Sequence, residues 1–270
     1  GTLGIATAIT LRLLRAPECV NVLLADFATM AAAGEAVRSI TAAGLLPAGM
    51  EIMDNVTINA VDDFFGYDEY PRDAAAVLLI ELDGQTAEVE ASAAQAEVLC
   101  KEAGARHLRR AEDSTACEVL WKGRKCAFSA VGKITPTYYV QDGVVPRSCL
   151  PWVLTSIEQL SREHELPVAN MFHAGDGNLH PVILFDPQVE GETERAERFG
   201  ADILKLCVDV GGCLTGEHGV GIEKRDLMSY QYNEIELAQQ RRIKTAFDAK
   251  WLLNPAKVFP LDSRLADEAA

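Results

Sequence analysis

Alternation between strand-like and helix-like segments constrains the fold of this sequence more than any other feature. Apolar, strand-like runs lie at residues 20–27, 47–53, 73–82, 107–111 and 138–145. Each is followed by a segment with helical spacing of apolar residues, at 29–43, 56–65, 86–103, 114–128 and 152–164. Gly44 and Gly104 stand where two of these helices should stop. The rhythm predicts sheets that carry helices on one face.

The second half continues this pattern. A hairpin is predicted over residues 168–184, and a helix over 193–210. A strand and a loop follow at 213–221, and a last helix spans 233–252. No strand–helix junction carries a Gly-x-Gly-x-x-Gly fingerprint, so the sequence does not support a dinucleotide-binding fold.

Charge and cysteine content narrow the classes of partner. The chain has 270 residues and a formal net charge of −15, which argues against nucleic acid or an anionic membrane as the main partner. A few basic residues can still form a pocket for a small anion. Seven cysteines without a Cys-x-x-Cys motif are typical of reduced thiols in a cytoplasmic protein. No apolar run reaches the ~18 residues that span a membrane.

Two histidines flank a predicted tight turn in the segment from Met171 to Pro181. An Asp-Gly pair favours a two-residue type I′ turn, because both central positions need positive φ. With Asp176 and Gly177 in those positions, His173 stands directly opposite His180. Opposed residues share a face of the hairpin, with Cβ atoms roughly 5 Å apart. The two imidazoles can then converge on one metal ion.

A second motif, Gly-Glu-His-Gly-Val-Gly at 216–221, offers a carboxylate from Glu217 and a third imidazole from His218. Two imidazoles and one carboxylate leave coordination positions open, as a catalytic metal site requires, and zinc, iron and manganese all fit this set. Other interpretations stay open: the hairpin histidines can be a structural pair bonded to backbone groups, and the Gly-rich loop can merely cap a helix.

These motifs together resemble the FAD-linked oxidases of the vanillyl-alcohol oxidase type, in the branch of glycolate oxidase D subunits and D-lactate dehydrogenases. The resemblance runs from Gly1 to Pro260 and rests on segments that occur in the family's order. They are Gly-Thr-Leu-Gly-Ile at 1–5, Trp-Lys-Gly-Arg-Lys-Cys-Ala-Phe at 121–128, Tyr-Tyr-Val-Gln-Asp-Gly-Val-Val-Pro-Arg at 138–147, His-Ala-Gly-Asp-Gly-Asn-Leu-His-Pro at 173–181, the motif at 216–221, and Asn-Pro-Ala-Lys-Val-Phe-Pro at 254–260.

The resemblance implies a fold and a division of the chain. The family's cap domain is an α+β structure with two ferredoxin-like units around an antiparallel sheet. Residues 1–17 are then a remnant of the FAD-binding domain, and residues 18–253 are the substrate, or cap, domain. Residues 254–270 return toward the flavin domain. Most of the FAD would be bound by an N-terminal domain that this sequence does not include.

Site residues are carried over from the family position by position. His173, His180 and Glu217 match ligands of a divalent metal, and His218 matches the base that takes the substrate hydroxyl proton. Arg124 matches a residue that clamps the substrate carboxylate, a task suited to a guanidinium. A further group matches positions at the flavin: Gly1, Thr2, Leu3, Gly4, Ile5 and Asn254.

The resemblance implies an FAD-dependent 2-hydroxy-acid dehydrogenase that passes a hydride from the substrate α-carbon to the flavin. Val140 replaces a lysine of the 2-hydroxyglutarate branch, and Pro181-Val182 replaces polar residues, so a small monocarboxylate such as glycolate or lactate is expected. Electrons would go to a quinone, a cytochrome or partner subunits, which can hold a cytoplasmic protein at the inner membrane. The chain alone is expected to be inactive. Two alternatives remain: a metal-dependent hydrolase, and a non-catalytic metal-binding or assembly module.

Overall fold

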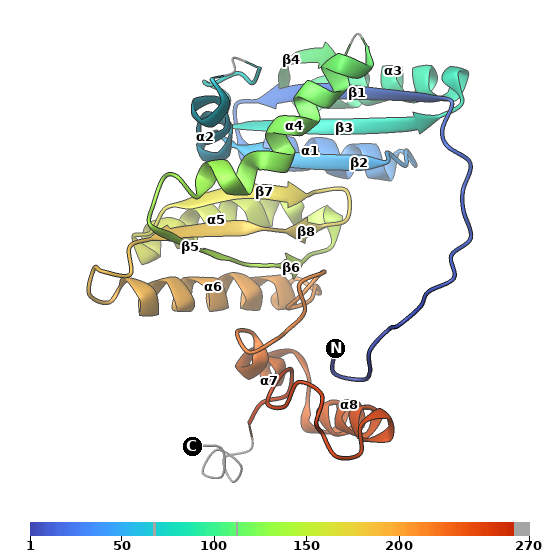
Figure 1. The fold of residues 1–270 in the computed structure, drawn as a ribbon. Helices are drawn as coiled ribbons and strands as arrows, with labels where there is room; N and C mark the ends of the chain where they lie inside the picture. The colour runs from blue at the N-terminus through green and yellow to red at the C-terminus, as the bar shows by residue number, and fades with distance from the viewer. Residues whose placement is uncertain (67–68, 112, 262–270) are drawn as a thin grey trace.

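One antiparallel sheet with helices packed against it forms the body of the protein (Figure 1). The structure is a computed structural model that describes residues 1–66, 69–111 and 113–261. All strand pairs described in this part of the chain run antiparallel. The predicted α+β class is therefore confirmed.

The first half of the sheet is a ferredoxin-like unit. Its strands are ordered β4-β1-β3-β2, so β3 lies between β1 and β2 as in a split βαβ arrangement. Helix α2 is an additional element between β2 and β3. The elements are β1 (Cys19–Phe27), α1 (Met30–Ala42), β2 (Gly49–Asp54), α2 (Asn55–Phe65), β3 (Ala76–Gly84), α3 (Thr86–Glu102) and β4 (Ala105–Arg110).

The second half repeats this order with interrupted strands. Strand β5 pairs with β9 and β6 with β8, while β7 borders both β8 and β9. In place of a fourth strand, Cys213 forms a single bridge to Val144. The strand predicted at the start of the strand-and-loop segment 213–221 is therefore reduced to one residue. Helix α4 (Ser114–Val131) connects the halves. The other elements are β5 (Thr137–Val140), β6 (Gly143–Val144), η1 (Arg147–Cys149), α5 (Leu150–His164), β7 (Val168–His173), β8 (Asn178–Leu179), β9 (Pro181–Phe185) and α6 (Glu192–Asp209).

The two units join edge to edge through β2 and β7. In this pairing Glu51 stands opposite His173, and Met53 stands opposite Met171. Opposed residues of an antiparallel pair point to the same face of the sheet. A carboxylate from the first unit is therefore brought beside a histidine from the second, although 122 positions separate them in the sequence.

Hydrophobic cores lie on both faces of the sheet, because successive residues of each strand point to opposite sides. Leu23, Ile52 and Phe172 pack with α1, α3, α5 and α6 on one face. The prediction of helices on one face holds for these four helices only, because α2 and α4 lie on the opposite face. On the other face, Val22 and Leu79 pack with α2 and α4. These two helices cover the first unit and the junction (Figure 1), and the histidine hairpin lies beyond them.

The C-terminal segment forms a small cluster of its own around Leu204, Leu214 and Leu237. It contains η2 (Arg225–Leu227), α7 (Met228–Gln231) and α8 (Glu234–Phe247). The last helix was predicted to reach residue 252 but ends at Phe247. The Asp248 carboxylate accepts hydrogen bonds from the backbone N–H groups of Leu252 and Leu253 and so turns the chain.

Residues 1–17 contain no helix or strand, and they run as an extended arm from α8 up to β1 (Figure 1). At its start, the Asn254 side chain donates to the Gly1 carbonyl at 2.6 Å, and the Lys244 ammonium donates to the Thr2 carbonyl. The start of the predicted FAD-domain remnant thus lies beside the start of the segment predicted to return toward that domain. Residues 262–270 of that second segment fall outside the described part. None of the described helices has the length and hydropathy needed to cross a membrane.

Candidate metal centre

The histidine hairpin turns one residue earlier than predicted, because its pairing is centred between Gly175 and Asp176 and not between Asp176 and Gly177. His173 pairs with Asn178, not with His180, and Asn170 pairs with Pro181. Residues 174–177 form a four-residue turn in which only Gly177 has positive φ, at +71°. The predicted register was therefore wrong by two positions. Because side chains alternate with period two, this shift keeps His180 on the face of His173, and their ring centroids are 5.1 Å apart.

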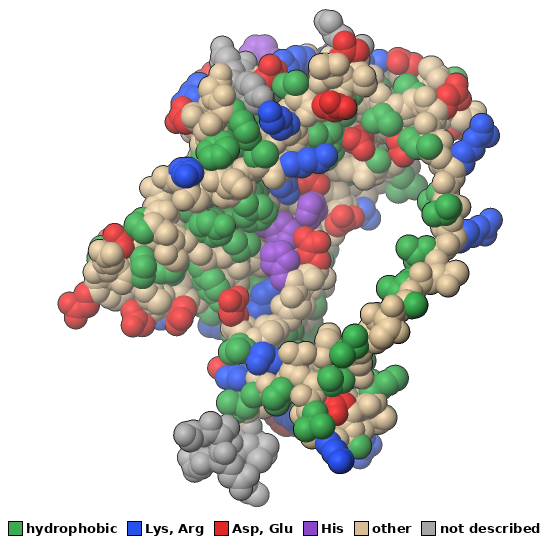
Figure 2. All heavy atoms as spheres, in the orientation of Figure 1, with side chains coloured by type: hydrophobic (Ala, Val, Ile, Leu, Met, Phe, Trp, Pro, Cys, Tyr) green, Lys and Arg blue, Asp and Glu red, His purple; other side chains and the backbone are tan. Residues whose placement is uncertain are grey.

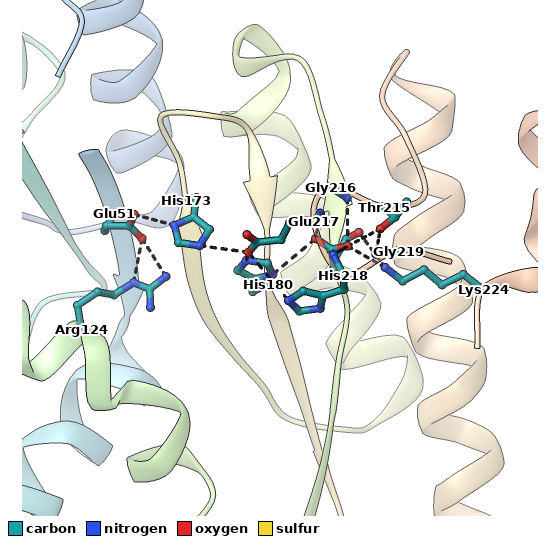
Figure 3. Close-up of polar contacts among 11 residues, drawn as sticks. Glu51, Arg124, His173, His180, Thr215, Gly216, Glu217, His218, Gly219 and Lys224 are labelled. Atoms are coloured by element: carbon teal, nitrogen blue, oxygen red, sulfur yellow. Dashed lines mark hydrogen bonds and ion pairs between the residues drawn. The ribbon is translucent and has the colours of Figure 1, made fainter. Parts of the chain in front are cut away.

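Glu217 lies between the two imidazoles (Figure 3). Its Oε1 is 2.9 Å from His180 Nε2 and 3.4 Å from His173 Nε2. One ligand atom from each of the three residues lies within 4.8 Å of the others. Two imidazole nitrogens and a carboxylate oxygen suit a divalent transition metal and leave positions for a substrate. The residues present therefore fit the predicted metal.

Glu51 contacts His173 at Nδ1, the ring nitrogen that faces away from Glu217. The Glu51 carboxylate is 2.7 Å from His173 Nδ1, which directs Nε2 toward Glu217. Glu51 also pairs with Arg124 of α4, at 2.8 Å between carboxylate oxygen and guanidinium. The hydrogen bond with Glu51 raises the pKa of His173 despite the opposing effect of burial. Such carboxylate–histidine pairs commonly orient metal ligands.

His180 has a different environment. It is almost fully buried, and burial lowers its pKa, with further lowering by the positive charges that His173 and His218 can carry. The His180 ring therefore stays neutral over a wider pH range. A neutral imidazole is the form that binds metals.

Asp142 anchors the loop that carries Glu217. It lies between β5 and β6 and is fully buried. Its carboxylate accepts hydrogen bonds from the backbone N–H groups of Gly216, Glu217 and His218, at 3.0–3.1 Å. Burial alone would raise the pKa of Asp142, but the Thr215 hydroxyl, these N–H groups and the Lys224 ammonium outweigh it and hold that pKa well below its usual range.

His218 stacks on His180 with ring centroids 4.9 Å apart and an interplanar angle of 8°. Its side chain is 45% exposed, and its Nε2 lies 4.0 Å from Glu217 Oε1. Asp142, His180 and His218 form a second set with metal-like spacing. The Asp142 oxygens, however, already accept several N–H groups and contact Lys224 at 3.0 Å, so the first set is the better metal site.

The remaining predicted residues lie outside the histidine cluster. Arg124 is buried and reaches the cluster only through Glu51. The residues predicted to contact flavin, Gly1–Ile5 and Asn254, lie beside α8 (Figure 1). Figure 2 shows the histidines at the edge of a hollow that the N-terminal arm encloses. Their roles toward substrate and flavin stay predictions.

Sequence reasoning missed three residues of this centre: Glu51, Asp142 and Lys224. No local pattern marks Glu51, because only the pairing of β2 with β7 brings it to His173. Asp142 lies within the 138–147 segment that carried part of the family resemblance, and this was the one available signal. Lys224 follows the 216–221 motif closely but carries no signature of its own.

Comparison with known proteins places the chain in a family. Residues 16–258 match the model of the FAD linked oxidases, C-terminal domain. The chain belongs to this family. The resemblance predicted from the sequence is confirmed.

Similar proteins include glycolate oxidase subunit GlcD of Escherichia coli (strain K12), which is 47% identical over 100% of this chain and 54% of that protein. The same-named subunit of Bacillus subtilis (strain 168) is 34% identical over 98% of this chain and 56% of its own length. A probable mitochondrial D-lactate dehydrogenase of Danio rerio is 32% identical over 97% of this chain and 52% of that protein. The chain spans about half the length of these relatives.

Solved structures show the same fold at low identity. The 4-ethylphenol oxidase from Gulosibacter chungangensis, in its isoeugenol complex, superposes with a TM-score of 0.69 at 14% identity, over 94% of this chain and 56% of that one. A p-cresol methylhydroxylase with substrate bound gives a TM-score of 0.68 at 14% identity, over 90% of this chain and 53% of that one. The cap-domain fold is therefore shared with these oxidases.

Proposed function

We propose that this chain is the substrate domain of an FAD-dependent 2-hydroxy-acid dehydrogenase of the glycolate and D-lactate type. The observation that carries the proposal is the convergence of His173, His180 and Glu217 within 4.8 Å in a member of this family. Relatives named glycolate oxidase subunit and D-lactate dehydrogenase support the substrate class. No observation favours a hydrolase or a non-catalytic module over this function.

His173, His180 and Glu217 would hold a divalent metal. A bound metal would lower the pKa of a substrate hydroxyl, and FAD would accept the hydride. His218 would take the hydroxyl proton at Nε2, the ring nitrogen 4.0 Å from Glu217 Oε1. Its half-exposed position lets it pass this proton on to water. His180, stacked against His218, would limit rotation of that ring.

Substrate size would be set near His180. Val182 is two residues further along the same strand face, and Val140 stands directly opposite it. Val182 is fully buried and Val140 packs against it, so neither position provides a charge for a second carboxylate, which suits a small monocarboxylate. Arg124 would contribute positive charge toward the single carboxylate of glycolate or D-lactate.

The rest of the flavin site would come from an N-terminal FAD domain. Residues 1–17 would be the end of that domain, residues 18–253 the cap, and residues 254–270 a return toward it. The hollow beside the histidines (Figure 2) and the exposed side chains of Ile5, Leu13 and Leu14 support this arrangement. Gly1–Ile5 and Asn254 would contact FAD there. Without this domain the chain would not turn over.

The whole protein would pass its electrons to a quinone, a cytochrome or partner subunits. The relatives named as subunits of glycolate oxidase support an assembly of this kind. Such partners would place a cytoplasmic protein at the inner membrane.

Flavin reduction in the whole protein that carries this chain tests the function. Anaerobic stopped-flow absorbance should show bleaching of the flavin by glycolate or D-lactate, with little reduction by D-2-hydroxyglutarate. His218→Gln should slow the reduction by about 10²- to 10⁴-fold, the usual contribution of a general base. His107→Gln, at an exposed position on β4, is the matched control. A flavin that no small 2-hydroxy acid reduces would exclude the proposal.

A further inference from the structure

Glu51 links the two units of the sheet at the metal centre. It is 7% exposed and lies on β2 opposite His173 of β7. Each of its oxygens is used differently: Oε1 meets His173 Nδ1 at 2.7 Å, and Oε2 meets Arg124 Nε at 3.0 Å and Nη2 at 2.8 Å. Figure 3 shows the three side chains in a row that ends at Glu217.

We propose that Glu51 is a positioning residue that fixes the tautomer of His173, and that Arg124 locks Glu51 in the orientation this requires. The inference deepens the proposed function and rests on it, because it takes His173 as a metal ligand. Neither Glu51 nor this use of Arg124 follows from any sequence motif.

The hydrogen-bonding capacities of Glu51 and Arg124 determine the tautomer of His173. An ionised carboxylate only accepts hydrogen bonds, so the neutral His173 ring must carry its proton on Nδ1. Its Nε2 then presents a lone pair toward Glu217, 3.4 Å away. Arg124 only donates, so it occupies Oε2 and leaves Oε1 for His173. If the Arg124–Glu51 ion pair served only to join α4 to β2, no histidine would be needed at Glu51 Oε1. His173 Nδ1 lies 2.7 Å from that oxygen.

Glu51→Gln separates positioning from simple packing, because glutamine has nearly the same shape but one acceptor and one donor. With its oxygen toward His173, its NH₂ faces the Arg124 guanidinium, donor against donor. With its oxygen toward Arg124, its NH₂ donates to Nδ1 and moves the ring proton to Nε2. Arginine therefore favours the second arrangement, in which His173 Nε2 carries the proton and offers no lone pair to a metal. Removing Arg124 as well should release glutamine to accept from Nδ1.

The test uses long-range ¹H–¹⁵N NMR of the histidine rings at pH 8.5 in the metal-free chain, together with titration by Zn²⁺ alone. The variants are Glu51→Gln, the double variant Glu51→Gln with Arg124→Met, and Asp26→Asn as a control. Asp26 is also a buried sheet carboxylate paired with an arginine, Arg106, but it lies on β1 away from the centre.

Wild type should show the Nδ1–H tautomer at His173, and Glu51→Gln should show Nε2–H with Zn²⁺ affinity about 10- to 100-fold weaker. The double variant should recover the tautomer and most of the affinity, and Asp26→Asn should keep both. An Nε2–H tautomer in wild type, or unchanged Zn²⁺ affinity in folded Glu51→Gln, would overturn the inference. A wild-type chain that shows Nδ1–H but binds no Zn²⁺ would instead count against the proposed metal site, so the two failures are distinguishable.

Discussion

At the scale of single residues, the centre depends on buried charges that hold other groups in place. Asp142 organises three successive N–H groups of the Glu217 loop and is paired with Lys224, which is itself 3% exposed. Glycine at position 216 lets the same loop lie close to β8, because a Cβ there would stand 2.5 Å from Asn178 Oδ1. The 216–221 motif thus presents Glu217 correctly only when Asp142, from the segment between β5 and β6, holds its backbone N–H groups.

Asp142→Asn should destabilise the chain by about 3 kcal/mol at pH 7, because Lys224 is left buried without its counter-charge. The pKa of Asp142 is lowered in the folded state, so its contribution to stability is complete above the unfolded pKa of about 4 and declines as pH falls. Urea unfolding from pH 7 to pH 3 should show the wild type and the variant converging toward acid. A difference that stays constant or grows toward acid would contradict this account.

At the scale of elements, sequence periodicity located most helices and strands, because each amphipathic segment needs one face buried and glycines mark several of its ends. Helix α3 was predicted at 86–103 and spans Thr86–Glu102. The strand predicted at 138–145 is interrupted instead at Gln141 and Asp142, since Asp142 turns to the 215–218 loop. A contact of that kind, between distant segments, leaves no periodic signal.

The hairpin shows why the face of the site could be predicted while its register could not. The Asp-Gly signal correctly placed a turn, but the turn spans four residues and only Gly177 takes the left-handed conformation. A register error of two preserves the face, whereas an error of one would have separated His173 from His180. Glu51 was unpredictable for a different reason: the edge-to-edge pairing of two units is set by the whole sheet.

Gly177→Ala should cost at least about 2 kcal/mol, because its φ is +71° and a Cβ would stand 2.2 Å from the Val145 carbonyl oxygen. Gly175→Ala in the same turn is the matched control. Its Cβ would meet Met50 at 3.4 Å, so a change below about 1 kcal/mol is expected. Thermal unfolding of both variants compares them directly, and equal losses would show that the turn geometry described here is wrong.

At the scale of the whole molecule, the N-terminal arm leaves apolar side chains without cover. Ile5 is 80% exposed, and Leu13 and Leu14 are 88% and 90% exposed. We expect the proposed FAD domain to bury them. Hydrogen–deuterium exchange should therefore be fast for residues 3–14 in the 270-residue chain and much slower in the whole protein, while β3 is protected in both. Fast exchange of the arm in both proteins would argue against the proposed domain boundary.

The central claim is that His173, His180 and Glu217 form a metal site, and metal content tests it most directly. The chain, purified without a histidine tag and soaked with zinc, iron or manganese, would be compared by mass spectrometry with a His173→Ala/His180→Ala double variant and with His107→Ala. Near-stoichiometric metal in the wild type and in His107→Ala, but not in the double variant, is the predicted result. Equal metal in all three, or none in the wild type after soaking, would contradict the claim.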